Sequence, residues 1–244
     1  MAKGASIQFK SYQETVPKLL GLMKLQTELK KYDKIVLKPT LSNPSEKSTP
    51  KEFTEAVLRF VLEHKNPVTE VFIAEGADGI ETEDLFQELG YRNLAERYGV
   101  SLIDLNNTET EEIALPNFLK FSEISYPSIL KNSFLISIPK LAEDEETEIS
   151  ASLSGMLGAF PASQYSGFFS KGKNKIRKWP IKYSIHDILR CKAPDFAIID
   201  ASSHGLILAG LPFEIDKQSA KLLGKDWKAV SYLNLLNTQF TDFE

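Results

Sequence analysis

The sequence contains a single cysteine, Cys191. One thiol cannot form an internal disulfide, and it cannot supply a four-cysteine iron–sulfur cluster or a cysteine-based structural zinc site. No iron–sulfur cluster is therefore expected. Arg190 and Lys192 flank the thiol and could lower its pKa, but we interpret it as a half-buried helix cysteine.

Excess positive charge and long apolar runs are also missing. The net charge of -4 predicts no general attraction to nucleic acid or to anionic membranes. No run approaches the roughly 18 apolar residues of a membrane span, and the N-terminal residues have no apolar segment typical of a secretory signal. We therefore expect a cytoplasmic protein. With 42% hydrophobic and 25% charged residues, the composition is typical of a globular protein, which we interpret as one domain over 1–244.

Common catalytic and cofactor motifs are absent in their standard forms. The sequence has no HExxH, no GxSxG, no Walker lysine loop and no GxGxxG. The three histidines (His64, His186 and His204) show no metal-ligand spacing, so the metal requirement stays open. The "EGADG" segment at 75–79 has two glycines after a predicted strand, which is a weak signal for phosphate binding.

Short apolar segments alternate with amphipathic ones along most of the chain. This alternation predicts an α/β fold with a mostly parallel sheet and helices on both faces. The predicted strands are 34–39, 70–76, 100–106, 133–140, 195–201 and 205–212. The predicted helices are 14–30, 50–64 (Pro50 first, with Thr49 or Ser48 as the cap), 83–99 (broken near Gly90), 183–192, 214–224 and 227–239. A long irregular insertion is expected around 142–182.

A charged residue stands at the end of each of five predicted strands: Lys38, Glu75, Asp104, Lys140 and Asp200. In open α/β sheets, ligands bind beyond the carboxyl ends of the strands. These side chains could bind an anion, hold a divalent metal or transfer protons. Alternatively, they are charged only because the chain reaches solvent there. Lys38 and Lys140 each adjoin a proline, which fixes the local backbone.

Charge is segregated in the predicted insertion. Residues 143–148, "EDEETE", are almost all acidic, whereas 149–186 contain no acid. The acid-free part includes "KGKNKIRK" at 171–178. These lysines could close over a phosphate or carboxylate, could contact RNA, or could form a solvated loop. The acidic balance of the whole chain disfavours nucleic acid.

A series of segments resembles domain of unknown function 362, collinearly over about 33–236. The segments are "IVLKPT", "STPKEFTEAV", "VFIAEG", "LGYRNLAERYGVSLIDLN", "FLISIPKL", "SLSGMLG", "APDFAIIDA" and "GLILAGLPFEIDKQSAKLLG". The resemblance implies an α/β fold and a role in binding or transforming something small, without supplying a reaction. It marks as family-like the positions Lys38, Pro39, Glu75, Gly76, Asp104, Pro139, Lys140, Gly158, His186, Asp200 and Asp216.

The chain also departs from the family pattern. Leu141 and then acids stand where the resemblance implies leucine followed by a further lysine, threonine and histidine, and Ser154 and Gly155 replace a lysine–asparagine pair. The glycine–proline loop expected after "IIDA" is missing. The chain could therefore have kept the scaffold while changing or losing the original chemistry.

Two main hypotheses follow. In the first, the protein binds a small anionic ligand, with or without transforming it. The catalytic residues would be Lys140, Asp200, Asp216 and His186, and the ligand-binding residues Lys38, Thr40, Glu75, Asp104, Lys171 and Lys173. The carboxylates would act as acid/base groups or as oxygen ligands for a hard cation such as Mg²⁺. In the second, a non-catalytic protein binds a partner protein through its acidic 143–148 segment.

Overall fold

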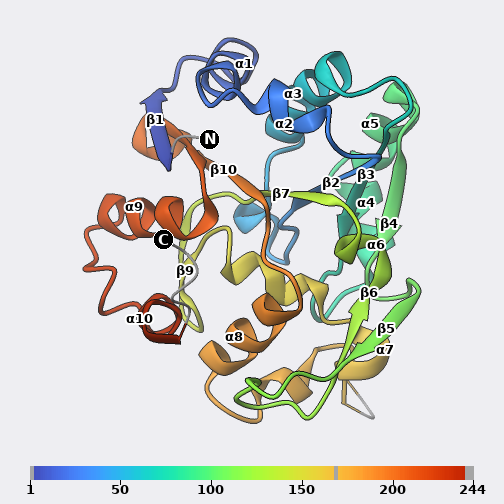
Figure 1. Ribbon diagram of the computed structural model, residues 1–244, viewed down its shortest axis with the longest axis vertical. Helices are drawn as coiled ribbons and strands as arrows, with labels where there is room; N and C mark the ends of the chain where they lie inside the picture. The colour runs from blue at the N-terminus through green and yellow to red at the C-terminus, as the bar shows by residue number, and fades with distance from the viewer. Residues whose placement is uncertain (1–2, 168–169, 240–244) are drawn as a thin grey trace.

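The computed structural model describes residues 3–167 and 170–239. A seven-stranded sheet forms its centre, and Figure 1 shows the helices around it. Its strand order is β1-β11-β10-β7-β2-β3-β4. The bounds are β1 Gly4–Gln8, β2 Lys34–Pro39, β3 Glu70–Glu75, β4 Ser101–Asp104, β7 Phe134–Ile138, β10 Phe196–Ala201 and β11 Leu206–Gly210. Neighbouring strands from β10 to β4 are parallel, and β11 is antiparallel to β10 and β1. The predicted mostly parallel sheet is confirmed.

The central strands are buried on both faces. All residues of β7 and β10 are buried, and so are all residues of β2 after Lys34. Side chains alternate between faces, so Val36 and Leu135 enter one hydrophobic core while Ile35 and Ile136 enter the other. Helices must therefore cover both faces.

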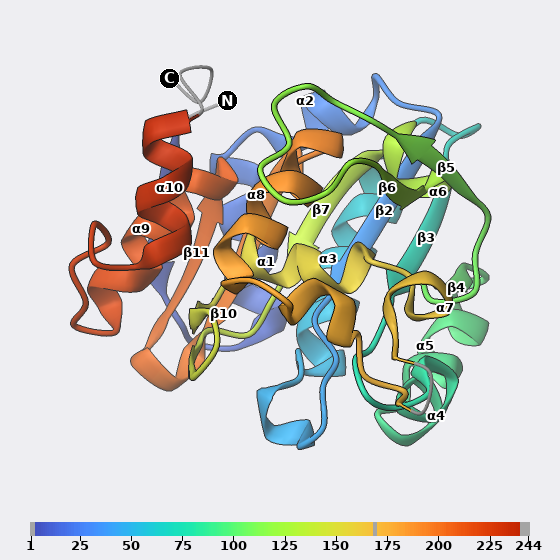
Figure 2. The ribbon, with the colours of Figure 1, turned by 90° about the horizontal axis from the view of Figure 1, so that it is seen from below.

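Helices pack on each side of the sheet, as the sequence predicts (Figures 1 and 2). One face is covered by α1 Tyr12–Leu22, α2 Leu25–Leu29, α3 Lys51–His64, α4 Thr82–Glu88 and α5 Tyr91–Tyr98. The other is covered by α8 Ile181–Cys191, α9 Pro212–Leu222 and α10 Ser231–Gln239. None of the helices in the described ranges is long and apolar enough to cross a membrane.

Several local predictions need correction. The predicted helix 14–30 is two helices, because Lys24 takes a left-handed conformation with φ 57°. Pro50 is the N-cap of α3 rather than its first residue, and Thr49 does not cap that helix. The Thr49 hydroxyl instead donates to the Ile138 carbonyl at 2.7 Å, which ties the β2 loop to β7. Strand β1 was not predicted, because this partly exposed edge strand lacks a continuous apolar run.

The segment 142–182 contains short elements rather than only irregular chain. They are the hairpin β8 Ala142–Asp144 and β9 Glu148–Ser150, η2 Ser154–Ala159, α7 Ala162–Tyr165 and η3 Asn174–Arg177. A second hairpin pairs β5 Thr110–Ile113 with β6 Ile124–Pro127, before α6 Ser128–Lys131. The remaining short turns are η1 Ser45–Lys47 and η4 Ser202–His204. Residues of η2 and η3 lie over the ends of β2 and β3, which encloses a pocket there.

Candidate functional site

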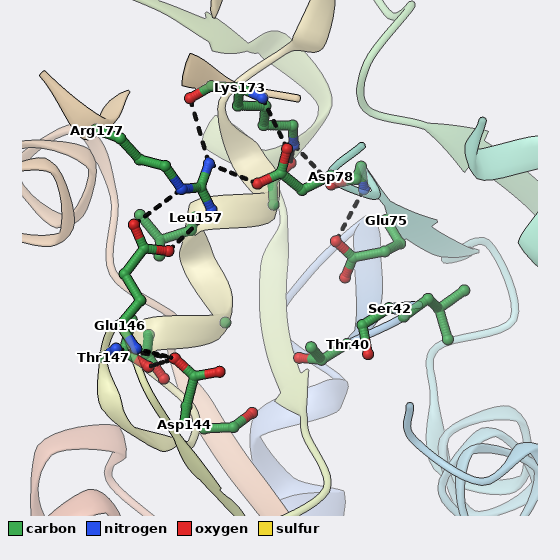
Figure 3. A pocket seen from close by; sticks show the side chains of 16 residues that line it. Thr40, Ser42, Glu75, Asp78, Asp144, Glu146, Thr147, Leu157, Lys173 and Arg177 are labelled. Carbon is green, nitrogen blue, oxygen red and sulfur yellow. Dashed lines mark hydrogen bonds and ion pairs between the residues drawn. The ribbon is translucent and has the colours of Figure 1, made fainter. Parts of the chain in front are cut away.

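A pocket lies at the carboxyl ends of β2 and β3, where sequence reasoning places a site (Figure 3). Its volume is about 160 Å³, which is small beside ligand pockets of roughly 300–1,000 Å³. The lining comes from the loops after β2 and β3, the β8–β9 hairpin, η2 and η3. The lining residues are Thr40, Leu41, Ser42, Glu75, Gly76, Asp78, Asp144, Glu146, Thr147, Ser150, Ser154, Gly155, Leu157, Gly158, Lys173 and Arg177.

A buried ion pair lies at the base of this pocket. Lys38 Nζ is 2.7 Å from Glu75 Oε2, and the two residues are 1% and 2% exposed. Lys38 also donates to the Gly155 carbonyl at 2.8 Å, and Glu75 Oε1 accepts the Gly76 N–H at 2.9 Å. Burial of two charges carries a desolvation cost, and hydrogen bonds to both partners offset it. The parallel pairing of β2 with β3 brings the two strand ends together.

Gly158 fits against this ion pair because it has no side chain. A Cβ at this position would lie 2.1 Å from Glu75 Oε1 and 2.8 Å from Lys38 Nζ. A Cβ at Gly76 would similarly lie 2.4 Å from the Gly158 carbonyl oxygen. Two glycines therefore let η2 approach the end of β3, and they place backbone carbonyls in the pocket wall.

Lys173 is a fully buried lysine of the pocket lining, 1% exposed. Its Nζ donates to the carbonyls of Gly76 at 2.6 Å and Gly158 at 3.1 Å. Figure 3 shows the side chain running toward Glu75 at the end of β3 and Asp78 in the loop that follows. Burial lowers the pKa of Lys173 to about 7, against the opposing effect of the Glu75 and Asp78 carboxylates. Near neutral pH this amine therefore exchanges readily between its charged and neutral forms.

Arg177 connects three segments around the pocket (Figure 3). Its guanidinium lies 2.7 Å from Asp78 Oδ2 in the loop after β3 and 2.8 Å from Glu146 Oε1 in the β8–β9 hairpin. A guanidinium presents several N–H groups in a fixed plane, so it suits this double contact. Asp144 fixes the hairpin turn by accepting the backbone N–H groups of Glu146 and Thr147.

Most charges in the lining are already paired. Lys38 pairs with Glu75, Arg177 pairs with Asp78 and Glu146, and Lys47 lies 3.6 Å from Asp144. Among the described residues of the lining, Lys173 is the cation without an ion-pair partner. The hydroxyls of Thr40 and Ser150 likewise make no hydrogen bond within the described ranges. The described residues also contain no group of three or more His, Cys, Asp or Glu side chains that could hold a metal ion.

Four of the ten predicted site residues meet at this pocket: Lys38 beneath it, and Thr40, Glu75 and Lys173 in its lining. Asp104 ends the next strand, β4, opposite Glu75 in register. Its carboxylate accepts the Asn106 backbone N–H at 2.9 Å and the Asn107 side-chain amide at 2.6 Å. It thus shapes the neighbouring loop rather than the lining.

Three other predicted residues lie outside the lining of this pocket. Lys140 donates to the Glu46 carbonyl at 2.6 Å and lines a different cavity, beside the loop before α3. Asp200 accepts the Tyr12 hydroxyl at 2.9 Å. Lys171 is exposed and pairs with Glu81 at 2.9 Å. The structure therefore separates Lys140 and Asp200 from Lys38 and Glu75.

Asp216 and His186 are buried in helices α9 and α8. The Asp216 carboxylate accepts four hydrogen bonds, from the Ser152 N–H and hydroxyl, the Leu153 N–H and the Tyr232 hydroxyl. It therefore anchors the segment between β9 and η2 to two helices. His186 Nδ1 lies 2.7 Å from Asp187 Oδ1 on the same helix. Neither residue is part of the pocket lining.

The acidic segment 143–148 forms the β8–β9 hairpin, and part of its charge faces inward. Asp144 and Glu146 belong to the lining, whereas Glu143 lies 3.4 Å from Lys225. Partner binding through this segment stays a prediction of the sequence. Sequence reasoning missed Asp78, Asp144, Ser150 and Arg177 as pocket residues. Asp78, Asp144 and Arg177 lie within segments that the sequence analysis singles out, at 75–79, 143–148 and 171–178.

The fold and the pocket define an α/β protein with a polar site at the carboxyl ends of its central strands. A family model described as "Domain of unknown function (DUF362)" matches residues 35–206, and the chain belongs to this family. The chain is also similar in structure to the lactate racemase apoprotein from Thermoanaerobacterium thermosaccharolyticum, with a TM-score of 0.57 and 13% sequence identity. That match covers 83% of this chain and 51% of the racemase, so the chain spans about half of its neighbour's length. No curated protein matches the sequence.

Proposed function

We propose that this protein binds a small, singly charged anionic metabolite in the pocket at the ends of β2 and β3. The observation that carries the proposal is Lys173, a buried cation of the lining without an ion-pair partner among the described residues. Its Nζ has two hydrogen bonds to carbonyls, so the third N–H of the ammonium form is available for a ligand oxygen. The hydroxyls of Thr40 and Ser150 offer neutral hydrogen-bond donors in the same lining.

Size and charge favour a small carboxylate over a nucleotide. Four carboxylates belong to the lining (Glu75, Asp78, Asp144 and Glu146), against the cations Lys173 and Arg177. A ligand with several negative charges would be repelled by this excess of acid. The structural neighbour is named for lactate, a small carboxylate, although a likeness at 13% identity supports the fold alone. The cytoplasmic location stays a prediction of the sequence.

Thermal denaturation in the presence of candidate ligands tests the proposal. Acetate, lactate, pyruvate, inorganic phosphate, ATP and Mg²⁺ are compared on the wild type, Lys173→Met and the matched control Lys171→Met. Ligand at 100 times its dissociation constant adds about 2.7 kcal/mol, which raises the melting temperature by several degrees at about 2–4 °C per kcal/mol.

We expect a shift with small carboxylates that Lys171→Met retains and Lys173→Met loses. Lys171 is the right control because it lies two residues away, on the surface and outside the lining. Shifts that persist in Lys173→Met, or that arise only with ATP or Mg²⁺, would contradict the proposed ligand class.

A further inference from the structure

We propose that Lys173 is a nucleophile that forms an imine with the carbonyl carbon of a small 2-oxo acid bound in this pocket. The inference rests on the proposed function, because the oxo acid is a member of the small-carboxylate class. It goes further by giving the pocket a covalent step and by specifying a carbonyl group in the ligand.

The hydrogen bonds of Lys173 match a neutral amine. A neutral primary amine has two N–H groups and one lone pair, and the Gly76 and Gly158 carbonyls accept the two N–H groups. Both glycines belong to the pocket lining. With its two N–H groups held by the wall, the tetrahedral nitrogen keeps its third position for a ligand. That position carries a lone pair in the amine and an N–H in the ammonium form.

The surroundings of Lys173 favour the neutral amine form of its side chain near pH 7. Charged groups from three segments influence its pKa: Lys38 from β2, Glu75 and Asp78 from β3 and the loop that follows it, and Asp104 from β4. The Arg177 guanidinium, from η3, donates to the Lys173 backbone carbonyl at 3.3 Å. Burial is the largest influence and lowers the pKa of Lys173 to about 7. An ordinary lysine has a pKa of about 10.4 and is neutral in roughly one molecule in a few thousand at pH 7. Desolvation of this kind activates lysines toward carbonyl compounds.

The proposed step balances without a further reactant. The Nζ lone pair attacks the carbonyl carbon, the C–N bond forms, and the carbonyl electron pair moves to oxygen, which takes a proton. The nitrogen loses its two protons overall, and the oxygen leaves as water, so amine and ketone give imine and one water. Glu75, a lining carboxylate and the acid that acts most strongly on Lys173, is suited to carry the proton between nitrogen and oxygen. A protonated imine keeps a positive charge beside the ligand's carboxylate.

Two other lysines serve as internal controls. Burial lowers the pKa of Lys120 to about 8, but its Nζ donates to the Ile176 carbonyl and the Ser184 hydroxyl, outside the pocket. Lys171 is exposed and pairs with Glu81. A reaction that needs only a lowered pKa would modify Lys120 as well, whereas one that needs the pocket would select Lys173.

Reductive trapping on the full chain tests the inference. Glyoxylate, pyruvate and 2-oxobutanoate are each added in limiting amounts with cyanoborohydride, which reduces an imine to a stable secondary amine. Peptide mass spectrometry at several times then gives the labelling rate of each lysine. We expect Lys173 to be labelled at least about tenfold faster than Lys171 and Lys120 near pH 7.5, from its larger neutral fraction and its place in the pocket. Equal rates at the three lysines with all three oxo acids overturn the inference.

Acetate and Lys173→Arg separate this inference from the proposed function. Acetate has no carbonyl to trap, so a thermal shift with acetate and pyruvate but no adduct on Lys173 overturns the imine and leaves ligand binding intact. No thermal shift and no adduct overturn both. Lys173→Arg keeps the charge and should lose the adduct. If circular dichroism shows that this variant is unfolded, the competition among lysines in the wild type still decides.

Discussion

Replacement of Lys38 by Met should destabilise the protein strongly, because it leaves the Glu75 carboxylate buried without its cation. Glu75 is 2% exposed and its Oε2 lies 2.7 Å from Lys38 Nζ. Removal of one partner of a buried pair costs about 3–5 kcal/mol. The Gly155 carbonyl also loses its donor. For a chain of this length, the expected fall in melting temperature is roughly 6–20 °C.

The double variant gives the sharper test of this reasoning. Lys38→Met together with Glu75→Leu replaces both charges by apolar side chains of similar volume, which removes the uncompensated charge. Replacement of a whole buried pair is often nearly neutral, so the double variant should lose much less stability than the two single variants summed.

Urea unfolding followed by far-ultraviolet circular dichroism measures all four free energies of the cycle. A double variant as unstable as the sum of the singles would refute the coupling of these two charges. A loss below about 1 kcal/mol for Lys38→Met alone would show that Glu75 is better solvated than its burial indicates.

Three further predictions concern the same region. Gly158→Ala should lower the free energy of unfolding by about 3 kcal/mol or more, since its Cβ would lie 2.1 Å from Glu75 Oε1. The control variant Gly21→Ala, with no neighbouring atom within 4 Å, should instead raise the free energy of unfolding by up to about 1 kcal/mol. Similar thermal melts for the two variants would contradict the packing argument. Asp216→Asn should lower the free energy of unfolding, measured by urea titration, by about 2–4 kcal/mol. The carboxylate accepts four hydrogen bonds, and in the variant an amide NH₂ would face at least one of their donors. An unchanged free energy of unfolding would argue against the anchoring role of Asp216. The wild type should gain stability relative to Lys173→Met as pH rises from about 7 toward 10. In this range Lys173 of the unfolded chain still binds a proton, whereas folded Lys173 has released it. A pH-independent difference in urea midpoints would contradict the lowered pKa.

The strands and the fold class were predictable because their signal is local. Segments such as 34–39 and 133–140 are apolar on both faces, and only a sheet covered on two sides buries such a strand completely. The edge strand β1 gave no such signal, since its residues are only partly buried and its pairing with β11 joins opposite ends of the chain.

Part of the site was predictable by the same logic. Lys38 and Glu75 end two apolar segments, and parallel neighbours bring such ends together. The sequence could not distinguish Lys38 from Lys140, because both adjoin a proline at a strand end. Lys38 is still within β2 and points into the covered region, 1% exposed, whereas Lys140 follows β7 and reaches the Glu46 carbonyl near the surface.

The lysines at 171–178 show the limit of sequence reasoning most clearly. Lys171 and Lys173 are two residues apart in the same basic segment, yet one is exposed and the other buried. Their difference depends on the contacts of Lys173 with Gly76, Asp78 and Gly158. Gly76 and Asp78 are far from Lys173 in the sequence, and Gly158 lies in another element, η2.

The sequence by itself thus determined the α/β fold, the helices on both faces and the strand ends at which the pocket lies. Each of these follows from hydrophobic periodicity and from the common direction of parallel strands. Only the tertiary structure decided which strand-end charges are enclosed and which loops enclose them. Burial of a charge depends on segments such as η2 and η3 that fold over the sheet, and those long-range contacts leave no periodic pattern in the chain.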